Sequence, residues 1–170
     1  MRCFLAAWPD ATTRLALAAV LDDVRQRVEH RRAARVDDLH LTLAFIGELS
    51  DDAARAIARE VAAVRFEPFE WRMDQLGMFA PAGVVWAGAS AETETSRPLL
   101  ELANELRRLL DRLRTPYDAR ALSPHVTLLH GVRRRFKTEH IASIVWPIDS
   151  VALYRSTGSR SAARYERILG

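Results

Sequence analysis

Leu39-His40-Leu41-Thr42-Leu43-Ala44-Phe45 is an apolar run interrupted by two polar residues, and its length and flanking turn signals predict a β-strand. Side chains alternate between the two faces of a strand. His40 and Thr42 therefore share one face. The other face is expected to be buried and carries Leu39, Leu41, Leu43 and Phe45. An imidazole and a hydroxyl would then stand side by side on the open face of the strand.

The same arrangement returns far downstream in Pro124-His125-Val126-Thr127-Leu128-Leu129. Here His125 and Thr127 share a face, opposite Val126 and Leu128. Five histidines and nine threonines in 170 residues would seldom give two such pairs by coincidence. The alternative is two core strands with incidental polar residues. That arrangement would leave four buried polar side chains in need of hydrogen-bond partners.

The two tetrapeptides His40-Leu41-Thr42-Leu43 and His125-Val126-Thr127-Leu128 resemble the paired His-x-Thr-x signature of the 2H phosphoesterase superfamily. Within it, the chain is most similar to the bacterial and archaeal RNA 2′,3′-cyclic phosphodiesterases, also described as 2′-5′ RNA ligases. The similarity extends to residues 2–7, 77–81, 84–88, 153–156 and 165–166. It implies an α+β fold in which two similar lobes, each an antiparallel sheet backed by helices, face each other across a central cleft. Residues 1–170 would form a single bilobal 2H phosphoesterase domain.

The resemblance also implies a reaction, the metal-independent hydrolysis of an RNA-terminal or nucleoside 2′,3′-cyclic phosphate to a 2′-phosphomonoester. Imidazole suits both proton transfers of this reaction because its reference pKa of ~6.5 lies near working pH. By resemblance, His40 would donate a proton and His125 would accept one, although the sequence itself does not distinguish the two roles. Thr42 and Thr127 would bind the phosphate through hydrogen bonds to its non-bridging oxygens. No cofactor or metal is expected.

One position departs from the family pattern. The family leads us to expect an arginine three residues after the second motif threonine, where this chain has His130. Strand alternation places His130 on the face opposite His125 unless Gly131 or a bulge turns it, so a structural role is favoured over a phosphate contact. The run Arg133, Arg134 and Arg135 could supply the missing charge, although such a run in a loop is more often simply solvated.

Three other functions remain open at this stage. The first is a 2H phosphoesterase that acts on another compound, such as a cyclic nucleotide, ADP-ribose cyclic phosphate or a 2′-5′ oligoadenylate. The second is a module that binds RNA ends without turnover. The third is a metal site built on His40 and His125, but neither motif supplies a close carboxylate or cysteine, so a zinc-type site would lack ligands.

Composition predicts a soluble globular protein, because 49% of the 170 residues are hydrophobic and 28% are charged. No segment approaches the ~18 apolar residues of a membrane helix, and no secretory signal is recognisable. We therefore expect a cytoplasmic protein with no membrane partner. We also expect a monomer, and the resemblance implies RNA ends or small cyclic nucleotides as its partners. The net charge is +3, and Lys137 is the only lysine. This use of arginine fits bidentate phosphate recognition, but also a general preference in amino-acid usage.

Periodicity predicts the remaining elements. Strands are expected at residues 2–8, where Cys3 would pack, and at 67–78, 84–89, 146–155 and 163–168. A helix is expected from Asp10 or Thr12 to about His30, with Leu17, Leu21, Val24 and Val28 on its buried side. A second helix, capped by Ser50 or Asp51, is expected to reach about residue 64. A third helix, capped by Ser96, would bury Leu99, Leu102, Leu106, Leu109 and Leu113. Residues 138–144 are expected to form a short helix with His140 at the surface.

Overall fold

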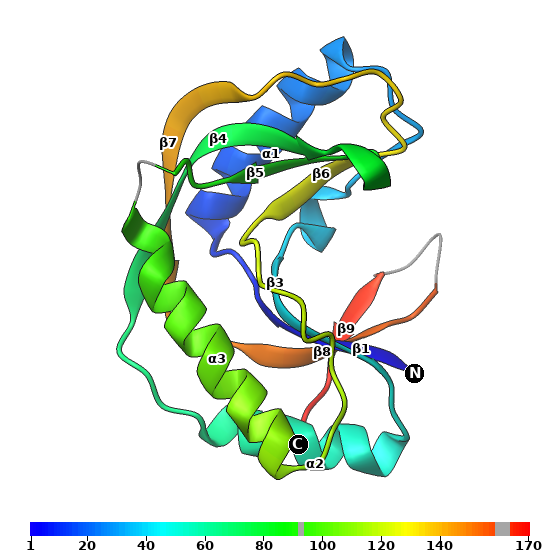
Figure 1. Ribbon diagram of the computed structural model, residues 1–170, viewed down its shortest axis with the longest axis vertical. Coiled ribbons are helices and arrows are strands. Elements are labelled where there is room, and N and C mark those ends of the chain that lie inside the picture. Colours follow the sequence, from blue (N-terminus) through cyan, green and yellow to red (C-terminus); the bar gives the residue numbers. More distant parts are fainter. Residues whose placement is uncertain (92–93, 159–163) are drawn as a thin grey trace.

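The computed structural model describes residues 1–91, 94–158 and 164–170, and its chain path is shown in Figure 1. The α-helices are α1 (Ala11–Arg27), α2 (Asp51–Ala63) and α3 (Arg97–Arg112). The strands are β1 (Arg2–Ala7), β2 (Arg32–Ala33), β3 (Leu41–Glu48), β4 (Phe69–Phe79), β5 (Val84–Gly88), β6 (Val126–His130), β7 (Glu139–Ile148), β8 (Ala152–Ser156) and β9 (Tyr165–Arg167). Short 3-10 turns occupy Val36–Asp38, Ala80–Ala82 and Glu94–Ser96. The predicted α+β class is confirmed.

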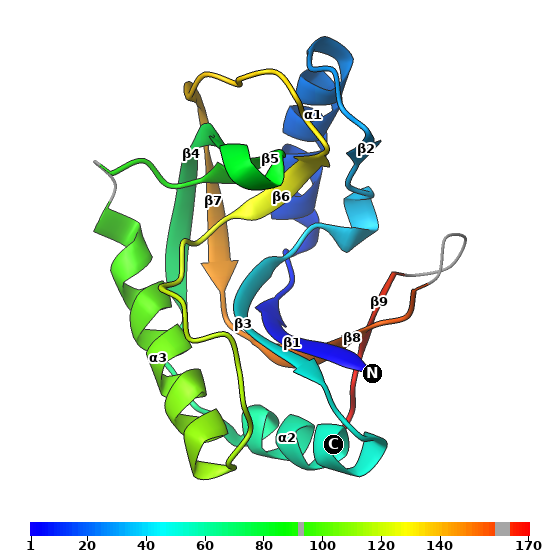
Figure 2. The ribbon, with the colours of Figure 1, turned by 45° about the vertical axis from the view of Figure 1, so that its right-hand side comes forward.

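The strands form a single antiparallel sheet in the order β7-β4-β5-β6-β3-β1-β8-β9, and β2 pairs with β6 beside this path. The sheet has two halves that meet where β6 lies against β3. The register of this junction pairs Leu41 with Val126, and both side chains are fully buried. Figure 2 shows β3 and β6 adjacent in the middle of the molecule, between the two groups of strands. The two halves therefore join at Leu41 and Val126, the residues between the histidine and the threonine of each motif.

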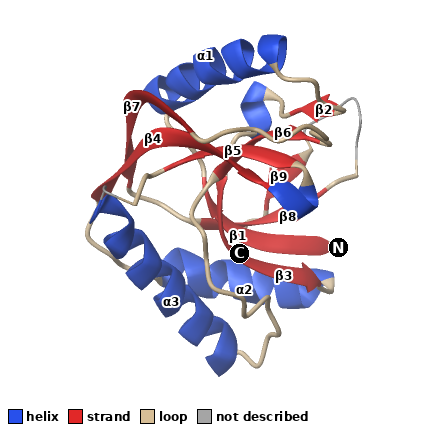
Figure 3. Cartoon of the chain, turned by 45° about the horizontal axis from the view of Figure 1, so that its top comes forward, coloured by secondary structure: helices blue, strands red, loops and turns tan. Residues whose placement is uncertain are grey.

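Helices back both halves of the sheet, as predicted. α1 packs against β7, whereas α2 packs against β8 and α3 against β3 and α2. Figure 3 shows the consequence, with α1 across one end of the strands and α2 and α3 across the other. Among the described residues, no helix is both long and apolar enough to cross a membrane. The single bilobal domain over residues 1–170 stays a prediction.

The apolar stripes of the helices are buried largely as their spacing predicts. Leu17, Leu21 and Val24 of α1 are buried, as are Leu99, Leu102, Leu106 and Leu109 of α3. Leu113 is 37% exposed, contrary to the prediction, because it caps the C-terminus of α3, beyond the buried part of the stripe. Cys3 is buried in β1 as expected.

Side-chain hydrogen bonds cap two of the helices at their N-termini. The Asp10 carboxylate accepts a hydrogen bond from the Thr13 N–H at 2.8 Å, and the Ser50 hydroxyl accepts one from Ala53 at 3.3 Å. Ser96 is the N-cap residue of α3, as predicted, but its side chain makes no cap hydrogen bond. Its hydroxyl instead accepts a hydrogen bond from the indole N–H of Trp71 at 3.2 Å. The buried indole needs this acceptor, and the need outweighs the cap.

The segment predicted as a helix at residues 138–144 is a strand instead. It is the first part of β7, which pairs along β4 and places Trp146 opposite Trp71. Pairing with a distant strand outweighs local helix propensity here. The predicted strand at 146–155 is divided between the end of β7 and β8, and α1 ends at Arg27, before His30. The last predicted strand begins at residue 163, which lies outside the described residues; β9 occupies its middle.

Each motif strand contains a β-bulge directly after its threonine. In β3, the residues on either side of Leu43 pair with β1, but Leu43 itself has no partner there. In β6, the residues on either side of Leu128 pair with β5, but Leu128 has no partner there. A bulge adds one residue and so reverses the side-chain alternation beyond it. Phe45 is therefore 38% exposed rather than buried as predicted. His130, at the matching position, turns toward the face of the motif histidines.

Candidate active site

The two motifs face one another across the junction between β3 and β6. In an antiparallel pair, the residue before a pairing partner on one strand lies opposite the residue after it on the other. Because Leu41 pairs with Val126, each motif histidine lies opposite the threonine of the other motif. The two histidines are then diagonal neighbours, for which Cα atoms lie about 7–8 Å apart. This spacing leaves room for a phosphate between the rings.

Both imidazole rings are oriented by the same kind of hydrogen bond to the backbone. His40 Nδ1 lies 2.6 Å from the carbonyl oxygen of Asp38, and His125 Nδ1 lies 2.7 Å from that of Ser123. In each motif the acceptor is the residue two positions earlier. A carbonyl oxygen only accepts hydrogen bonds, so Nδ1 carries the proton in both rings. Nε2 is the atom left on each ring to take up or release a proton.

All four predicted side chains line one cavity of ≈ 380 Å³. The cavity is closed by residues of β2, by the 3-10 turn that precedes β3, and by the start of β9. Its lining residues are Arg32, Ala33, Ala34, Arg35, Asp38, His40, Thr42, His125, Thr127, His130, Arg164 and Tyr165. The structure therefore brings together every residue that the sequence singled out as catalytic or substrate-binding. Their roles stay predictions.

A second hollow of ≈ 440 Å³ adjoins this cavity, since both are lined by Thr42, His125 and Thr127. It is more apolar, and its walls include Phe45 and Phe79. The bulge in β3 is what places the ring of Phe45 there. Arginines line both cavities, Arg107 and Arg120 in the second, which differs from the first by the rings of Phe45 and Phe79.

Aromatic rings surround His40 more completely than His125. Trp8 stacks on the His40 ring at a centroid distance of 4.9 Å and an interplanar angle of 8°. Tyr165 meets it edge-on at 4.9 Å and Phe4 lies at 5.1 Å. His125 has one aromatic neighbour among the described residues, Phe79, which is edge-on at 4.8 Å. The aromatic faces around His40 favour a positive charge on that ring.

The groups that shift the pKa of each ring also differ. Burial lowers the pKa of His40, but the carbonyl and the carboxylate of Asp38 both oppose this effect, while His125 adds to it. Burial likewise lowers the pKa of His125, which only the carbonyl of Ser123 opposes. The Asp38 carboxylate is itself buried, and its Oδ2 has no hydrogen-bond partner; the nearest cation is Arg35, at 3.9 Å. A carboxylate thus supports a proton on one ring and not on the other.

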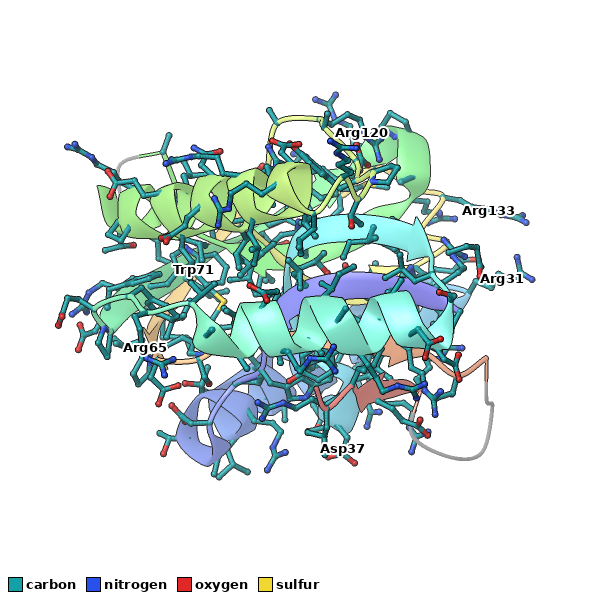
Figure 4. All side chains as sticks on the ribbon, turned by 90° about the horizontal axis from the view of Figure 1, so that it is seen from below. Arg31, Asp37, Arg65, Trp71, Arg120 and Arg133 are labelled. Atoms are coloured by element: carbon teal, nitrogen blue, oxygen red, sulfur yellow. The ribbon has the colours of Figure 1, made fainter. Side chains whose placement is uncertain are left out.

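His130 lies in the wall of the cavity, not in the structural position that strand alternation favoured. Burial, followed by the charges of Arg32 and Arg164, lowers its pKa to about 4. Arg133, Arg134 and Arg135 are exposed and do not line the cavity. Figure 4 shows the Arg133 side chain extending outward from the edge of the molecule. The charge beside His130 therefore comes from other arginines than those the sequence suggested.

Some lining residues were not identified from the sequence. Asp38 stands two positions before His40, so alternation gave a usable signal for it. Arg32 belongs to a two-residue strand and Arg164 directly precedes the three-residue β9, and no periodic pattern marks segments so short. Only the long-range pairing of their strands brings them to the site.

The two remaining histidines lie outside the cavity. His140 is exposed on β7, as expected for a surface residue. His30 is partly buried, and its Nδ1 lies 2.7 Å from the carbonyl oxygen of Val28. Across the described ranges, no three or more His, Cys, Asp or Glu residues gather as candidate metal ligands.

Comparison with known proteins identifies relatives of this arrangement. The family model of the 2′-5′ RNA ligase superfamily matches residues 13–160. The RNA 2′,3′-cyclic phosphodiesterase of Escherichia coli (strain K12) is 30% identical over 155 residues, covering 84% of this chain and 86% of the relative. The protein of the same name from Archaeoglobus fulgidus is 30% identical over 148 residues, covering 85% and 79%. The crystal structure of E. coli LigT complexed with 3′-AMP superposes with a TM-score of 0.83 at 27% identity, covering 98% of this chain and 94% of that one.

Proposed function

Since this chain belongs to the 2′-5′ RNA ligase superfamily, we propose that it hydrolyses the 2′,3′-cyclic phosphate of an RNA end or a nucleoside to a 2′-phosphomonoester, without a metal. The relatives named RNA 2′,3′-cyclic phosphodiesterase support the substrate class. In this proposal residues 1–170 act as one bilobal domain, and the protein works as a monomer in the cytoplasm.

One observation carries the proposal: the pairing of Leu41 with Val126 places the two motifs about a common centre. Two imidazoles then flank the same space, each with Nδ1 bonded to a backbone carbonyl and Nε2 free for proton transfer. Hydrolysis of a cyclic phosphate needs a base on one side of phosphorus and an acid on the other. The arrangement supplies one ring for each side.

The proposed reaction uses both rings. Nε2 of His125 takes a proton from water as the water oxygen attacks phosphorus. The bond from phosphorus to the 3′ oxygen breaks, and Nε2 of His40 gives its proton to that oxygen. The phosphate remains on the 2′ oxygen, so the product is a 2′-phosphomonoester with a free 3′ hydroxyl. The carboxylate of Asp38 and the ring of Trp8 support this assignment, because both favour a protonated His40.

The two threonines hold the phosphate in this mechanism. Thr42 and Thr127 lie on the same face as the histidines and line the cavity between them. Their hydroxyls donate hydrogen bonds to the non-bridging oxygens, which carry the charge of the transition state. This places a donor from each half of the sheet on the one phosphate.

The test is product identity. The protein is incubated with a chelator and adenosine 2′,3′-cyclic phosphate, and the phosphomonoester is identified by chromatography against authentic 2′-AMP and 3′-AMP. We expect 2′-AMP alone. A 3′-AMP product would overturn the proposed cleavage at the 3′ oxygen, and activity that disappears with the chelator and returns with zinc would overturn metal independence.

A second measurement separates an enzyme from a module that only binds RNA ends. His125→Ala is assayed for turnover and, by calorimetry, for affinity toward 2′-AMP. The proposal requires turnover to collapse while 2′-AMP still binds. A wild-type protein that binds a cyclic-phosphate end but never opens it would instead establish the binding module.

A further inference from the structure

Arg32 and His130 are directly opposite partners across the β2–β6 ladder. Both side chains line the cavity, and Arg164 lines it beside them. Directly opposite side chains are close neighbours, and placing two basic groups there destabilises a sheet. Burial, and then the charges of Arg32 and Arg164, lowers the pKa of His130. An anion among the three side chains would offset the charges of both arginines and favour a proton on His130.

Among the described residues, no carboxylate is paired with these arginines. Within the described part of the chain, no carboxylate forms an ion pair with Arg32 or Arg164, although eleven other ion pairs are present. Asp38 is the only acidic residue in the cavity lining, and its carboxylate lies nearest to Arg35. The cavity wall thus presents arginines in excess of its acidic groups.

The backbone holds this cluster in place. The Arg31 N–H donates to the His130 carbonyl at 3.0 Å, and the Ala34 N–H donates to the Leu128 carbonyl at 2.7 Å. Gly131 then turns away with a φ of +70°, and a Cβ on it would lie 2.5 Å from the Cβ of Arg31. β2 and β6 are therefore packed closely where Arg32 meets His130. The backbone positions of Arg32 and His130 are therefore fixed in the cavity wall, where the side chain of Arg32 is exposed to solvent.

We propose that Arg32, His130 and Arg164 bind a second phosphate of the substrate, one attached on the 5′ side of the ribose that carries the cyclic phosphate. This inference rests on the proposed function, because it takes the motif residues to hold the first phosphate. Thr127 and His130 are three residues apart, which spans about 10 Å in an extended strand. The bulge at Leu128 shortens this span and turns His130 inward. A neighbouring phosphate of the same nucleotide chain lies within such a reach.

Two kinds of substrate carry that chemistry. In an RNA end, the second phosphate is the phosphodiester that links the terminal nucleotide to the one before it. In a small nucleotide, it is a 5′-phosphate. A nucleoside 2′,3′-cyclic phosphate with a free 5′ hydroxyl has neither, and it serves as the reference substrate.

The kinetic test compares three substrates: adenosine 2′,3′-cyclic phosphate, its 5′-phosphorylated form, and a dinucleotide that ends in a 2′,3′-cyclic phosphate. For the wild type we expect kcat/KM to be about 10-fold or more higher with a second phosphate, as for one added charge-assisted contact. In Arg32→Gln and Arg164→Gln this preference should fall toward unity through a rise in KM. Arg133→Gln is the matched control, because Arg133 is exposed outside the cavity, and it should keep the full preference.

The three substrates also distinguish the sources of the phosphate. A preference for the dinucleotide alone assigns the site to a phosphodiester of RNA, and an equal preference for the 5′-phosphorylated nucleotide assigns it to any 5′-phosphate. A wild type with no preference for either substrate overturns the proposal. So does an Arg32→Gln protein that loses activity equally on all three substrates.

A binding experiment keeps this inference separate from the proposed reaction. Calorimetry with adenosine 2′-monophosphate and adenosine 2′,5′-bisphosphate measures the second phosphate without turnover. We expect the bisphosphate to bind about 10-fold or more tightly, and Arg32→Gln to remove that difference. If no cyclic substrate is hydrolysed but this difference is found, the proposed function fails and the phosphate site stands. Equal affinities for the two ligands would refute the phosphate site.

Discussion

The half of the sheet that carries His40 and the half that carries His125 share a backbone plan but differ in what surrounds the two rings. In each, a carbonyl two residues earlier holds Nδ1, a threonine follows two residues later, and a bulge comes next. Around His40 stand Trp8, Phe4, Tyr165 and the Asp38 carboxylate, whereas His125 has Phe79. The shared plan places both rings in the wall of one cavity, and the differences favour a proton on His40 more than on His125.

The comparison extends to the positions beyond the bulges. Phe45 and His130 each stand three residues after a motif threonine and face the site. Phe45 lies under the guanidinium of Arg2, at 5.3 Å from the ring centroid, whereas His130 lies opposite Arg32. One half therefore offers an aromatic surface and the other a basic one. A substrate with a base on one side and a second phosphate on the other would bind in a single orientation.

The largest expected effect comes from removing either ring. His40→Ala and His125→Ala should each lower kcat by about 10²–10⁴, the usual contribution of one positioned proton transfer. Because the two rings act on one reaction, the double variant should lose less than the product of the single losses. Steady-state turnover of adenosine 2′,3′-cyclic phosphate measures this. His140→Ala, on an exposed histidine, is the control and should match the wild type. A loss below 10-fold in either single variant would contradict the mechanism.

Removing either hydroxyl tests the symmetry of the phosphate contacts. Thr42→Val and Thr127→Val keep the side-chain shape and should each reduce kcat/KM about 10-fold or more, the scale of one hydrogen bond to a charged group. Equal losses would show that the phosphate lies centrally between the halves. A loss confined to one variant would instead show that one half alone holds the phosphate.

The glycines that follow the two bulges provide a comparison of stability. Gly47 has a φ of +95° with nothing within 4 Å of an added Cβ, so Gly47→Ala should cost the backbone strain alone, about 1–2 kcal/mol. Gly131→Ala adds an overlap with Arg31 and should cost more. Urea unfolding measures both free energies. Equal costs would mean that β2 moves aside freely, and the cluster around Arg32 would then not be fixed.

The smallest expected effect is on the pH profile. The Asp38 carboxylate raises the pKa of His40, so Asp38→Asn should lower that pKa further. If His40 must be protonated to act, activity falls as pH rises through its pKa, and the alkaline limb of kcat/KM should move to lower pH. The acidic limb, set by deprotonation of His125, should stay in place. Ser123→Ala is the matched control in the other half. His125 Nδ1 is hydrogen-bonded to the backbone carbonyl of residue 123, which this substitution keeps. Movement of the acidic limb in Asp38→Asn would reverse the assignment of acid and base.

The sequence was sufficient for those parts of the fold and site that depend on local alternation. The motif strands, the shared face of each His-Thr pair and the buried stripes of α1 and α3 follow from spacing alone. The orientation of Phe45 and His130 does not, because each bulge is defined by how β1 or β5 pairs with the motif strand. The same holds for β7, which is a strand through its pairing with β4. Arg32 and Arg164 reach the cavity only through contacts that join distant segments.

The bulges have a consequence for how such a protein can change over evolutionary time. The extra residue of each bulge lies between the side chains that would perform the reaction and the side chain that would determine substrate specificity. Positions 45 and 130 can then be exchanged singly, leaving the atoms around the phosphorus undisturbed. A lineage with this framework could acquire new nucleotide preferences in single-residue steps while its chemistry stayed constant.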